Sequence, residues 1–294
     1  VAPVTQVEAK FDQYGRYVLP DPETGEERPW TRATTVANTL ADRRGLEQWA
    51  KRNVLLGIAA RPDLYALAVS CKPEDKDQLN RIVADAEEAA KAHSGANLGT
   101  ALHRITERVD RGEDLDIPDQ WRADVDAYCQ ALVDNHLIVD PDWMERIVVL
   151  PEYGIAGTLD RLLYIGKKGG MAIIGDLKTG QDVVRYGMTE IAIQLAIYAN
   201  ATHAWNGVDY EKMPPVYTDR ALVIHLPVGQ GRCEIHQVDI RAGMQALRAA
   251  LWVREWRKRR DLSEPYKSPL AGMSPLGTPI GKEVTAADDA DDDW

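Results

Sequence analysis

The chain has 294 residues, of which 45% are hydrophobic and 28% are charged, and its formal net charge is −11. This composition is typical of a globular protein, and no apolar run approaches the roughly 18 residues that a membrane-spanning helix needs. An acidic balance by itself argues against a nucleic-acid partner. The charge is uneven, however, because the basic stretch "VREWRKRRD" precedes an aspartate-rich end, "DDADDDW". Net charge therefore does not decide the class of partner.

Three cysteines, Cys71, Cys129 and Cys233, are widely spaced and odd in number. Such a set favours reduced thiols over a disulfide framework or a metal cluster. The first residues, "VAPVTQVEAKFD", lack the basic-then-apolar pattern of a signal peptide. We therefore expect a cytoplasmic protein that has no membrane partner.

The first third of the chain is predicted to be mainly helical. A short strand and a Pro/Gly turn come first, in "GRYVLPDPETGEERPW", and Thr34 or Thr35 is a candidate cap for the helix that follows. A second amphipathic helix covers "EDKDQLNRIVADAEEAAKAHS", and we expect a break between Gly95 and Gly99. We assign residues 1–98 to an N-terminal, mainly helical part that packs on the core.

Residues 99–262 are predicted to form an α/β core. Helical patterns in "TALHRITERVD" and "PDQWRADVDAYCQALVDNH" are followed by β-rich runs in "MERIVVLPE", "GTLDRLLYI" and "GMAIIGDL". The helical stretch "MTEIAIQLAIYANATHAW", two further strands and a long final helix complete this part. Residues 263–294 are rich in Pro, Gly, Ser and Asp and are predicted to be a disordered acidic tail. No phosphate-binding Gly-x-x-x-x-Gly-Lys-Ser/Thr sequence is present, so no nucleotide-driven motor is indicated.

Two aspartates lie in the hairpin formed by the second and third β-rich runs. Asp160 and Asp176 are each eight residues from Lys168, in the middle of the turn "GKKGG". Residues equidistant from a turn centre pair across a regular hairpin, which would place the two aspartates opposite each other with Cβ atoms about 5 Å apart. Lys178 shares the face of Asp176, because side chains alternate along a strand.

Opposed carboxylates destabilise a sheet, and a divalent cation between them would relieve the repulsion. Carboxylate oxygens on strands suit Mg²⁺ or Mn²⁺, and Lys178 beside such a cation could act on a water and offset phosphate charge. The hairpin therefore favours metal-assisted phosphodiester hydrolysis. Removing either aspartate is then expected to leave the melting temperature of the metal-free protein unchanged or higher. The alternative for a single Asp-x-Lys is a plain ion pair at a strand end, which is commoner.

Two predicted helices carry polar residues four positions apart. His103 and Glu107 share a face in "GTALHRITE", and Gln194 and Tyr198 share a face in "IQLAIY". Taken alone, a histidine on a helix is more often a core or surface residue than a ligand, and the second pair is typical of a half-buried helix face.

Together, four segments resemble the signature of the RecB-family nucleases of the PD-(D/E)XK superfamily. The resemblance covers about a third of the chain, and the N-terminal third is similar to stand-alone phage exonucleases. It implies a restriction-endonuclease-like core, in which a mixed central sheet is flanked by helices. The segments, in the order and spacing of that family, are Gly99-Thr-Ala-Leu-His103-x-x-x-Glu107, Gly157-x-x-Asp160, Asp176-x-Lys178 and Gln194-x-x-x-Tyr198.

The resemblance also implies a metal centre for Mg²⁺ or Mn²⁺. His103, Asp160 and Asp176 would be its side-chain ligands, and the backbone carbonyl of Leu177 would complete the protein's share. Lys178 would be the catalytic lysine.

Four further residues receive supporting roles from the same resemblance. Gln194 and Tyr198 would support the lysine or contact a DNA phosphate. Glu107 would contact the metal ligands without binding the metal itself. Glu152, which precedes the strand of Asp160, would help to bind the metal or a water.

The implied activity is that of a metal-dependent DNA exonuclease, which hydrolyses phosphodiester bonds at DNA ends in phage or bacterial recombination or repair. Its partners would be linear DNA ends, including single-stranded ones, and a recombination or single-strand-binding protein. A phage-encoded member would act in the host cytoplasm. A structure-selective endonuclease with the same site is one alternative. A non-catalytic DNA-binding module is another, and the filled catalytic positions argue against it.

One departure from the family pattern concerns iron. The iron–sulfur members use four cysteines, one before and three after the nuclease motifs, whereas only Cys233 follows Tyr198 here. We therefore expect no iron–sulfur cluster.

The final helix ends in basic residues interleaved with tryptophans, in "LRAALWVREWRKRR". Arg254, Arg257 and Lys258 are candidate DNA contacts, because cations and aromatic rings suit a single-stranded backbone and its bases. The equally weighted alternative is a helix whose tryptophan face lies in the core and whose basic end is solvated. The segment Asp288–Trp294 is interpreted as a solvated acidic tail, with competition for the DNA site and recruitment of a partner as alternatives.

Overall fold

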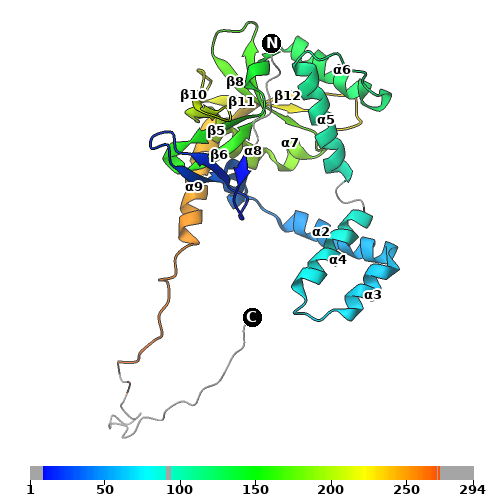
Figure 1. Ribbon diagram of the computed structural model, residues 1–294, viewed down its shortest axis with the longest axis vertical. Helices are drawn as coiled ribbons and strands as arrows, with labels where there is room; N and C mark the ends of the chain where they lie inside the picture. The colour runs from blue at the N-terminus through cyan, green and yellow to red at the C-terminus, as the bar shows by residue number, and fades with distance from the viewer. Residues whose placement is uncertain (1–8, 91–93, 270, 272–294) are drawn as a thin grey trace. The chain divides into compact units, whose positions relative to one another are not determined.

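The computed structural model describes residues 9–90, 94–269 and 271, and Figure 1 shows the arrangement of their elements. Two mixed β-sheets with surrounding helices make the described part an α/β structure. The larger sheet contains, in spatial order, β1 (Lys10–Phe11), β2 (Tyr17–Pro20), β3 (Glu27–Arg32), β6 (Ile155–Leu159), β5 (Arg146–Leu150), β9 (His203–Trp205) and β10 (Tyr210–Lys212). The smaller sheet contains β12 (Glu234–Asp239), β11 (Arg220–His225), β8 (Ala172–Lys178), β7 (Arg161–Ile165) and β4 (Leu137–Val139).

Helices cover both faces of the smaller sheet (Figure 1). One face packs against α5 (Ser94–Asp110) and α6 (Asp119–Asp134), through apolar side chains such as Leu102 and Tyr128. The other face packs against α8 (Met188–Ala199), which also contacts β5 and β6 of the larger sheet. The remaining elements of this region are α1 (Ala33–Ala37), α7 (Val183–Tyr186), α9 (Ile240–Trp256) and the short 3₁₀ turns Asn38–Leu40, Pro141–Trp143 and Pro151–Tyr153.

The chain passes from the larger sheet to the smaller one at Asp160. The run "GTLDRLLYI" is therefore two strands, β6 and β7, and not the single strand that its pattern predicts. The hairpin register is confirmed, because Arg161 pairs with Gly175 and Tyr164 pairs with Ala172. Both pairs are centred on Lys168, so the next pair outward is Asp160 and Asp176.

Two local predictions for the first hundred residues are wrong. Thr34 and Thr35 lie inside α1, whose N-cap is Arg32 without a side-chain hydrogen bond, and the next helix starts only at Arg44. The predicted break is also wrong, because Gly95 and Gly99 both lie within α5. By contrast, the strand and turn predicted in residues 15–30 are present as β2 and the turn to β3, and these strands extend the larger sheet beside β6.

Gly99 is explained by a close approach. A Cβ atom there would lie 2.4 Å from Oγ1 of Thr179, the residue that follows β8. The missing side chain therefore lets α5 pass directly over the end of the strand that carries Lys178.

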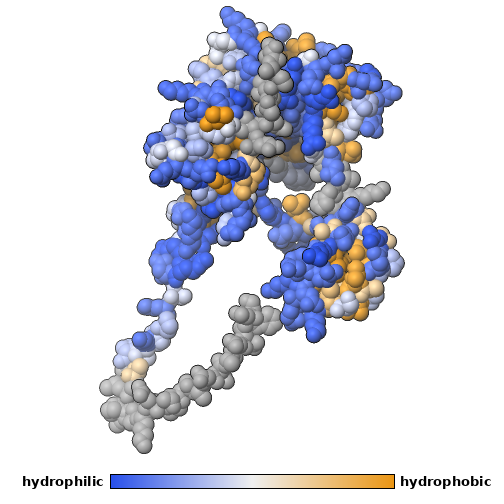
Figure 2. Space-filling view, viewed as in Figure 1, coloured by the Kyte–Doolittle hydropathy of each residue, from blue (hydrophilic) through white to orange (hydrophobic). Residues whose placement is uncertain are grey.

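Three helices form a separate small bundle. α2 (Arg44–Ala60), α3 (Pro62–Ser70) and α4 (Lys76–Ala89) pack around Leu64, Ile82 and Ala86. Figure 2 shows that apolar side chains gather on the surface of this bundle. Leu55, Leu56, Tyr65 and Val69 of these helices are exposed. None of the described helices combines the length and the apolar character that a membrane span requires.

The contact between α8 and α9 gives a first testable prediction. A Cβ on Gly243 of α9 would lie 2.2 Å from the carbonyl oxygen of Ala192 on α8, and a backbone cannot move aside as a side chain can. Gly243→Ala is therefore expected to lower the free energy of unfolding by about 1–3 kcal/mol, as measured by urea denaturation. Gly45→Ala in α2 is the matched control, because nothing lies within 4 Å of its Cβ position. That change should be neutral or stabilise by up to about 1 kcal/mol. Equal effects of the two substitutions would contradict the close helix contact.

Candidate metal centre

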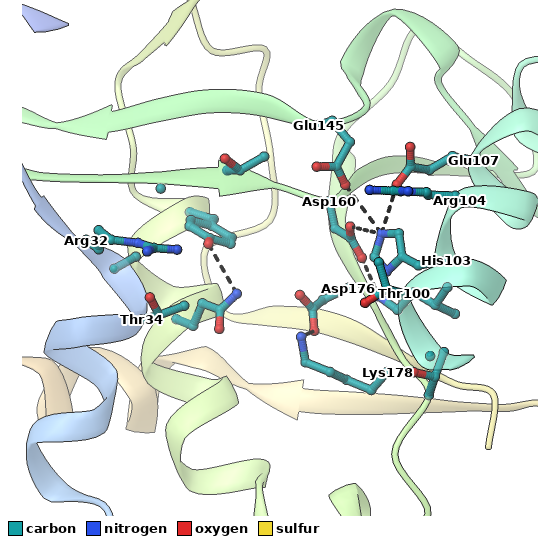
Figure 3. Close-up of a pocket in the computed structure, with 18 of the residues that line it drawn as sticks. Arg32, Thr34, Thr100, His103, Arg104, Glu107, Glu145, Asp160, Asp176 and Lys178 are labelled. Atoms are coloured by element: carbon teal, nitrogen blue, oxygen red, sulfur yellow. Dashed lines mark hydrogen bonds and ion pairs between the residues drawn. The ribbon is translucent and has the colours of Figure 1, made fainter. Parts of the chain in front are cut away.

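A cleft with a volume of about 480 Å³ opens at the point where the chain crosses between the sheets. Its residues come from segments that are far apart in the sequence: α1, α5, α8, the start of β5 and the ends of β6 and β8. Figure 3 shows that the charged side chains converge on one another inside this cleft. The lining includes Arg32, Thr34, Thr100, His103, Arg104, Glu107, Glu145, Asp160, Asp176, Leu177, Lys178, Gln194 and Tyr198.

The imidazole of His103 is surrounded by carboxylates. Its Nε2 atom lies 2.7 Å from Oδ1 of Asp160, 3.2 Å from Oε1 of Glu107 and 3.4 Å from Oε1 of Glu145. Burial opposes the charged imidazolium, but Asp160 and Glu145 outweigh it and raise the pKa of His103 to about 10. In the absence of a metal, this histidine is therefore a cation that holds the acidic side chains together.

Burial also shifts the pKa of Glu145. Loss of solvation, opposed by the hydrogen bond to His103, raises the pKa of Glu145 to about 7. Burial raises the pKa of Asp160 as well, but the neighbouring cations His103 and Arg161 reverse this and hold it well below the usual range. The two carboxyl groups therefore differ: Asp160 is firmly ionised, and Glu145 exchanges its proton near neutral pH.

A buried arginine fixes Asp160 from behind. Arg161 is fully buried, and its guanidinium contacts Asp160 at 3.3 Å and Asp110 at 2.7 Å. It also donates a hydrogen bond to the hydroxyl of Thr106 at 2.8 Å. The backbone N–H of Leu177 donates to Oδ2 of Asp160 at 2.6 Å. Oδ2 of Asp160 is thus held by Arg161 and the backbone, and Oδ1 is held by His103.

Asp176 is buried beside Lys178, and their charged atoms are 2.5 Å apart. The atom of Asp176 that Lys178 contacts is Oδ2. Burial raises the pKa of Asp176 against the lowering effect of Lys178. Burial alone would lower the pKa of Lys178. The negative charges of Asp176 and Asp160 outweigh this effect, so the pKa of Lys178 is raised. In the metal-free protein, Lys178 is therefore the counter-charge of Asp176.

The donor set fits a divalent metal. Ligand atoms of His103, Glu145 and Asp160 lie within 4.8 Å of one another. Asp176, on β8, lines the same cleft outside this group of three, and its Oδ2 atom lies 2.5 Å from Nζ of Lys178. One imidazole and several carboxylates suit Mn²⁺, and the oxygen-rich part suits Mg²⁺.

The structure brings most of the sequence-predicted residues to this cleft. His103, Glu107, Asp160, Asp176, Leu177 and Lys178 all line it. Gln194 and Tyr198 line it too, but the amide of Gln194 donates to the hydroxyl of Tyr198 at 3.1 Å, while Lys178 pairs with Asp176.

Glu152 is not brought to the cleft. It is exposed in the 3₁₀ turn Pro151–Tyr153, which precedes β6, whereas Asp160 follows the last residue of that strand. The length of β6 separates the two acids, so Glu152 does not share a metal with Asp160.

Glu145 is the residue that sequence reasoning missed. Its backbone N–H donates to the carbonyl of Asp160 at 3.1 Å, next to the pair of Arg146 and Leu159. Glu145 and Asp160 are equidistant from the centre of the turn Pro151–Gly154, so the rule that paired Asp160 with Asp176 would also have paired it with Glu145. The φ angle of Glu145 is 52°, a left-handed conformation that is uncommon for this residue type and frequent at functional sites.

The basic end of α9 is solvent-exposed. Trp252 and Trp256 are 64% and 45% exposed, so the alternative of a tryptophan face in the core is wrong. Arg257 and Lys258 are exposed after the helix ends, and Arg254 is half-buried in its last turn. The predictions for Asp288–Trp294 lie outside the described residues.

The surroundings of the two aspartates predict unequal effects on stability, which replaces the expectation that removing either one relieves repulsion. In metal-free protein, Asp160→Asn should lower the free energy of unfolding by about 3 kcal/mol or more, because His103 and Arg161 lose their shared counter-charge. Asp176→Asn should change it by less than about 1 kcal/mol, because burial already disfavours the ionised carboxylate and Lys178 reaches solvent. Urea denaturation with a chelator present measures both values. A larger loss for Asp176→Asn than for Asp160→Asn would refute this reading of the cleft.

Comparisons with known proteins do not assign this chain to a family. The chain matches none of the protein-family models searched, and no curated protein is significantly similar to it. The functional argument therefore rests on the geometry of the cleft and on the sequence motifs that line it.

Proposed function

We propose that the protein is a metal-dependent deoxyribonuclease of the RecB type that hydrolyses phosphodiester bonds at DNA ends. The observation that carries the proposal is the convergence of His103, Glu145, Asp160, Asp176 and Lys178 in one cleft. A restriction-endonuclease-like core is part of it. The antiparallel β7–β8 hairpin, with parallel β11 beside β8 and helices α5 and α8 on its two faces, is consistent with such a core.

A bound Mg²⁺ or Mn²⁺ would polarise the scissile phosphate and lower the pKa of a water. Asp160 and Asp176 would hold the ion from two adjacent strands, with His103 supplied by α5. Lys178 has a raised pKa, so it is an ammonium at neutral pH. It therefore suits stabilising charge on the phosphate and orienting the water better than removing a proton.

The mouth of the cleft has groups that suit a nucleic-acid backbone. Arg32 and Arg104 are exposed, and Figure 3 shows them on different sides of Asp160. Thr34 and Thr100 add hydroxyl groups. Cations and hydroxyls of this kind position DNA through its phosphates and do not select a sequence.

The test is digestion of linear DNA labelled at either the 5′ or the 3′ end, beside a covalently closed circle, with Mg²⁺ or Mn²⁺. The proposal expects metal-dependent release of mononucleotides or short products from the linear DNA and an intact circle. The Asp176→Asn protein, purified in the same way, controls for contaminating nuclease.

Other outcomes select the alternatives. Nicking of the closed circle would replace the exonuclease with an endonuclease that uses the same site. Binding of DNA without any metal-dependent hydrolysis would leave a DNA-binding module and overturn the proposed activity.

A further inference from the structure

A second group of metal-binding residue types lies on the β11–β12 hairpin, outside the cleft described above. His225 of β11 is paired directly with Glu234 of β12, and His236 is two residues further along β12. This register places the three side chains on one face of the sheet. Their ligand atoms lie within 4.8 Å of one another.

The hydrogen bonding of His225 leaves one ring nitrogen as a free electron-pair donor. Its Nε2 atom is 2.9 Å from the carbonyl oxygen of Gly180, which can only accept, so Nε2 carries the proton. The other nitrogen, Nδ1, is buried and has no hydrogen-bond partner within the described residues. The residue as a whole is 2% exposed. A metal-bound histidine commonly shows this arrangement, with one nitrogen donating to a backbone carbonyl and the other facing the ion.

The other two side chains complete a ligand set. Nε2 of His236 is buried without a hydrogen bond of normal geometry, and it lies 3.3 Å from Oε2 of Glu234. Tetrahedral Zn²⁺ with bonds of about 2.1 Å needs its ligand atoms about 3.4 Å apart, which this pair already satisfies. The second oxygen of Glu234 is 2.9 Å from the guanidinium of Arg232, so this carboxylate is held in place.

We propose that His225, Glu234 and His236 bind a transition-metal ion, with Zn²⁺ as the preferred one. Two imidazoles and one carboxylate select Zn²⁺ over Mg²⁺, because nitrogen donors favour the softer ion. Three protein ligands leave one tetrahedral position for water. The ion would tie β12 and β11 to Gly180, which follows Lys178 and Thr179 at the end of β8. This site would therefore steady the segment that leaves the candidate metal centre. The proposal does not depend on nuclease activity.

The test uses the full chain after treatment with a chelator. Because His103 offers an imidazole to the first centre, all proteins carry His103→Gln. Zn²⁺ is then titrated in competition with a chromophoric chelator, with excess Mg²⁺ present.

One equivalent of Zn²⁺ should bind to the His103→Gln protein. Adding His236→Gln or Glu234→Gln should weaken this binding by at least about tenfold, since even partners outside the ligand shell have effects of that size. Adding His203→Gln, which removes an imidazole from β9, should not.

A second readout separates loss of the site from loss of the fold. Zn²⁺ should raise the melting temperature of the His103→Gln protein, since a ligand of the folded state stabilises it by mass action. It should not do so once His236→Gln is added, although that protein should melt cooperatively without metal. No Zn²⁺ binding by the His103→Gln protein would overturn the proposal. Equal Zn²⁺ affinity with and without His236→Gln would overturn it as well.

Discussion

Replacing Lys178 with methionine is expected to slow DNA hydrolysis by about 10²- to 10⁴-fold while leaving Mn²⁺ binding intact. The ammonium lies 2.5 Å from Asp176, so it is placed to act at the metal centre without being a ligand. Methionine keeps much of the length of the side chain and removes the charge. Mn²⁺ affinity should stay the same or increase, because a cation beside the ion is lost. Single-turnover hydrolysis and calorimetric titration with Mn²⁺ measure the two quantities separately.

Lys167→Met is the matched control for this experiment. Lys167 is exposed in the turn of the same hairpin, so its charge is lost without any change in the cleft. The Lys167→Met protein should hydrolyse DNA at the rate of the protein without substitutions. Loss of Mn²⁺ binding together with activity in Lys178→Met would mean that the hairpin itself had collapsed. Near-normal activity of Lys178→Met would remove the lysine from the mechanism.

The second large effect concerns stability. Arg161→Met is expected to lower the free energy of unfolding by about 3–5 kcal/mol, because the ionised Asp160 and the buried Asp110 lose their common partner. The guanidinium is fully buried and contacts both carboxylates, which makes it the structural support of the candidate metal centre. Urea denaturation gives the difference in unfolding free energy.

Arg108→Met serves as the comparison, because Arg108 of α5 forms an exposed ion pair with Glu113, which follows the end of that helix. Exposed pairs contribute about 0–1 kcal/mol, so this variant should stay within that range. If Arg161→Met cost no more than Arg108→Met, the buried network would not be what holds Asp160 in place.

The sequence predicted the hairpin geometry well, because the register of a regular hairpin follows from its turn. Counting outward from Lys168 placed Asp160 opposite Asp176, and the pairing of Arg161 with Gly175 confirms that register. The same count around the preceding turn would have found Glu145, but this residue lies before a strand and outside the recognised motifs. A side chain that acts across a hairpin leaves no local pattern at its own position.

Other features depend on tertiary contacts that no local pattern encodes. Gly99 resembles a helix breaker, yet it lies within α5, where a side chain would meet Thr179. The division of one apolar run into β6 and β7 at Asp160 also has no local signal, since both halves are equally apolar. The buried contact of Arg161 with Asp110 joins residues 51 positions apart. Such long-range pairs are decided by the packing of the whole core.

The central claim is that the cleft holds a divalent metal between the strands of Asp160 and Asp176. Crystals grown with Mn²⁺ and measured near the manganese absorption edge test it most directly, because anomalous scattering locates the ion independently of its ligands. The account predicts an anomalous peak on the order of 2.0–2.5 Å from carboxylate oxygens of Asp160 and Asp176 and from the imidazole of His103. A well-ordered cleft without such a peak at saturating Mn²⁺, or a peak that contacts neither aspartate, would contradict it.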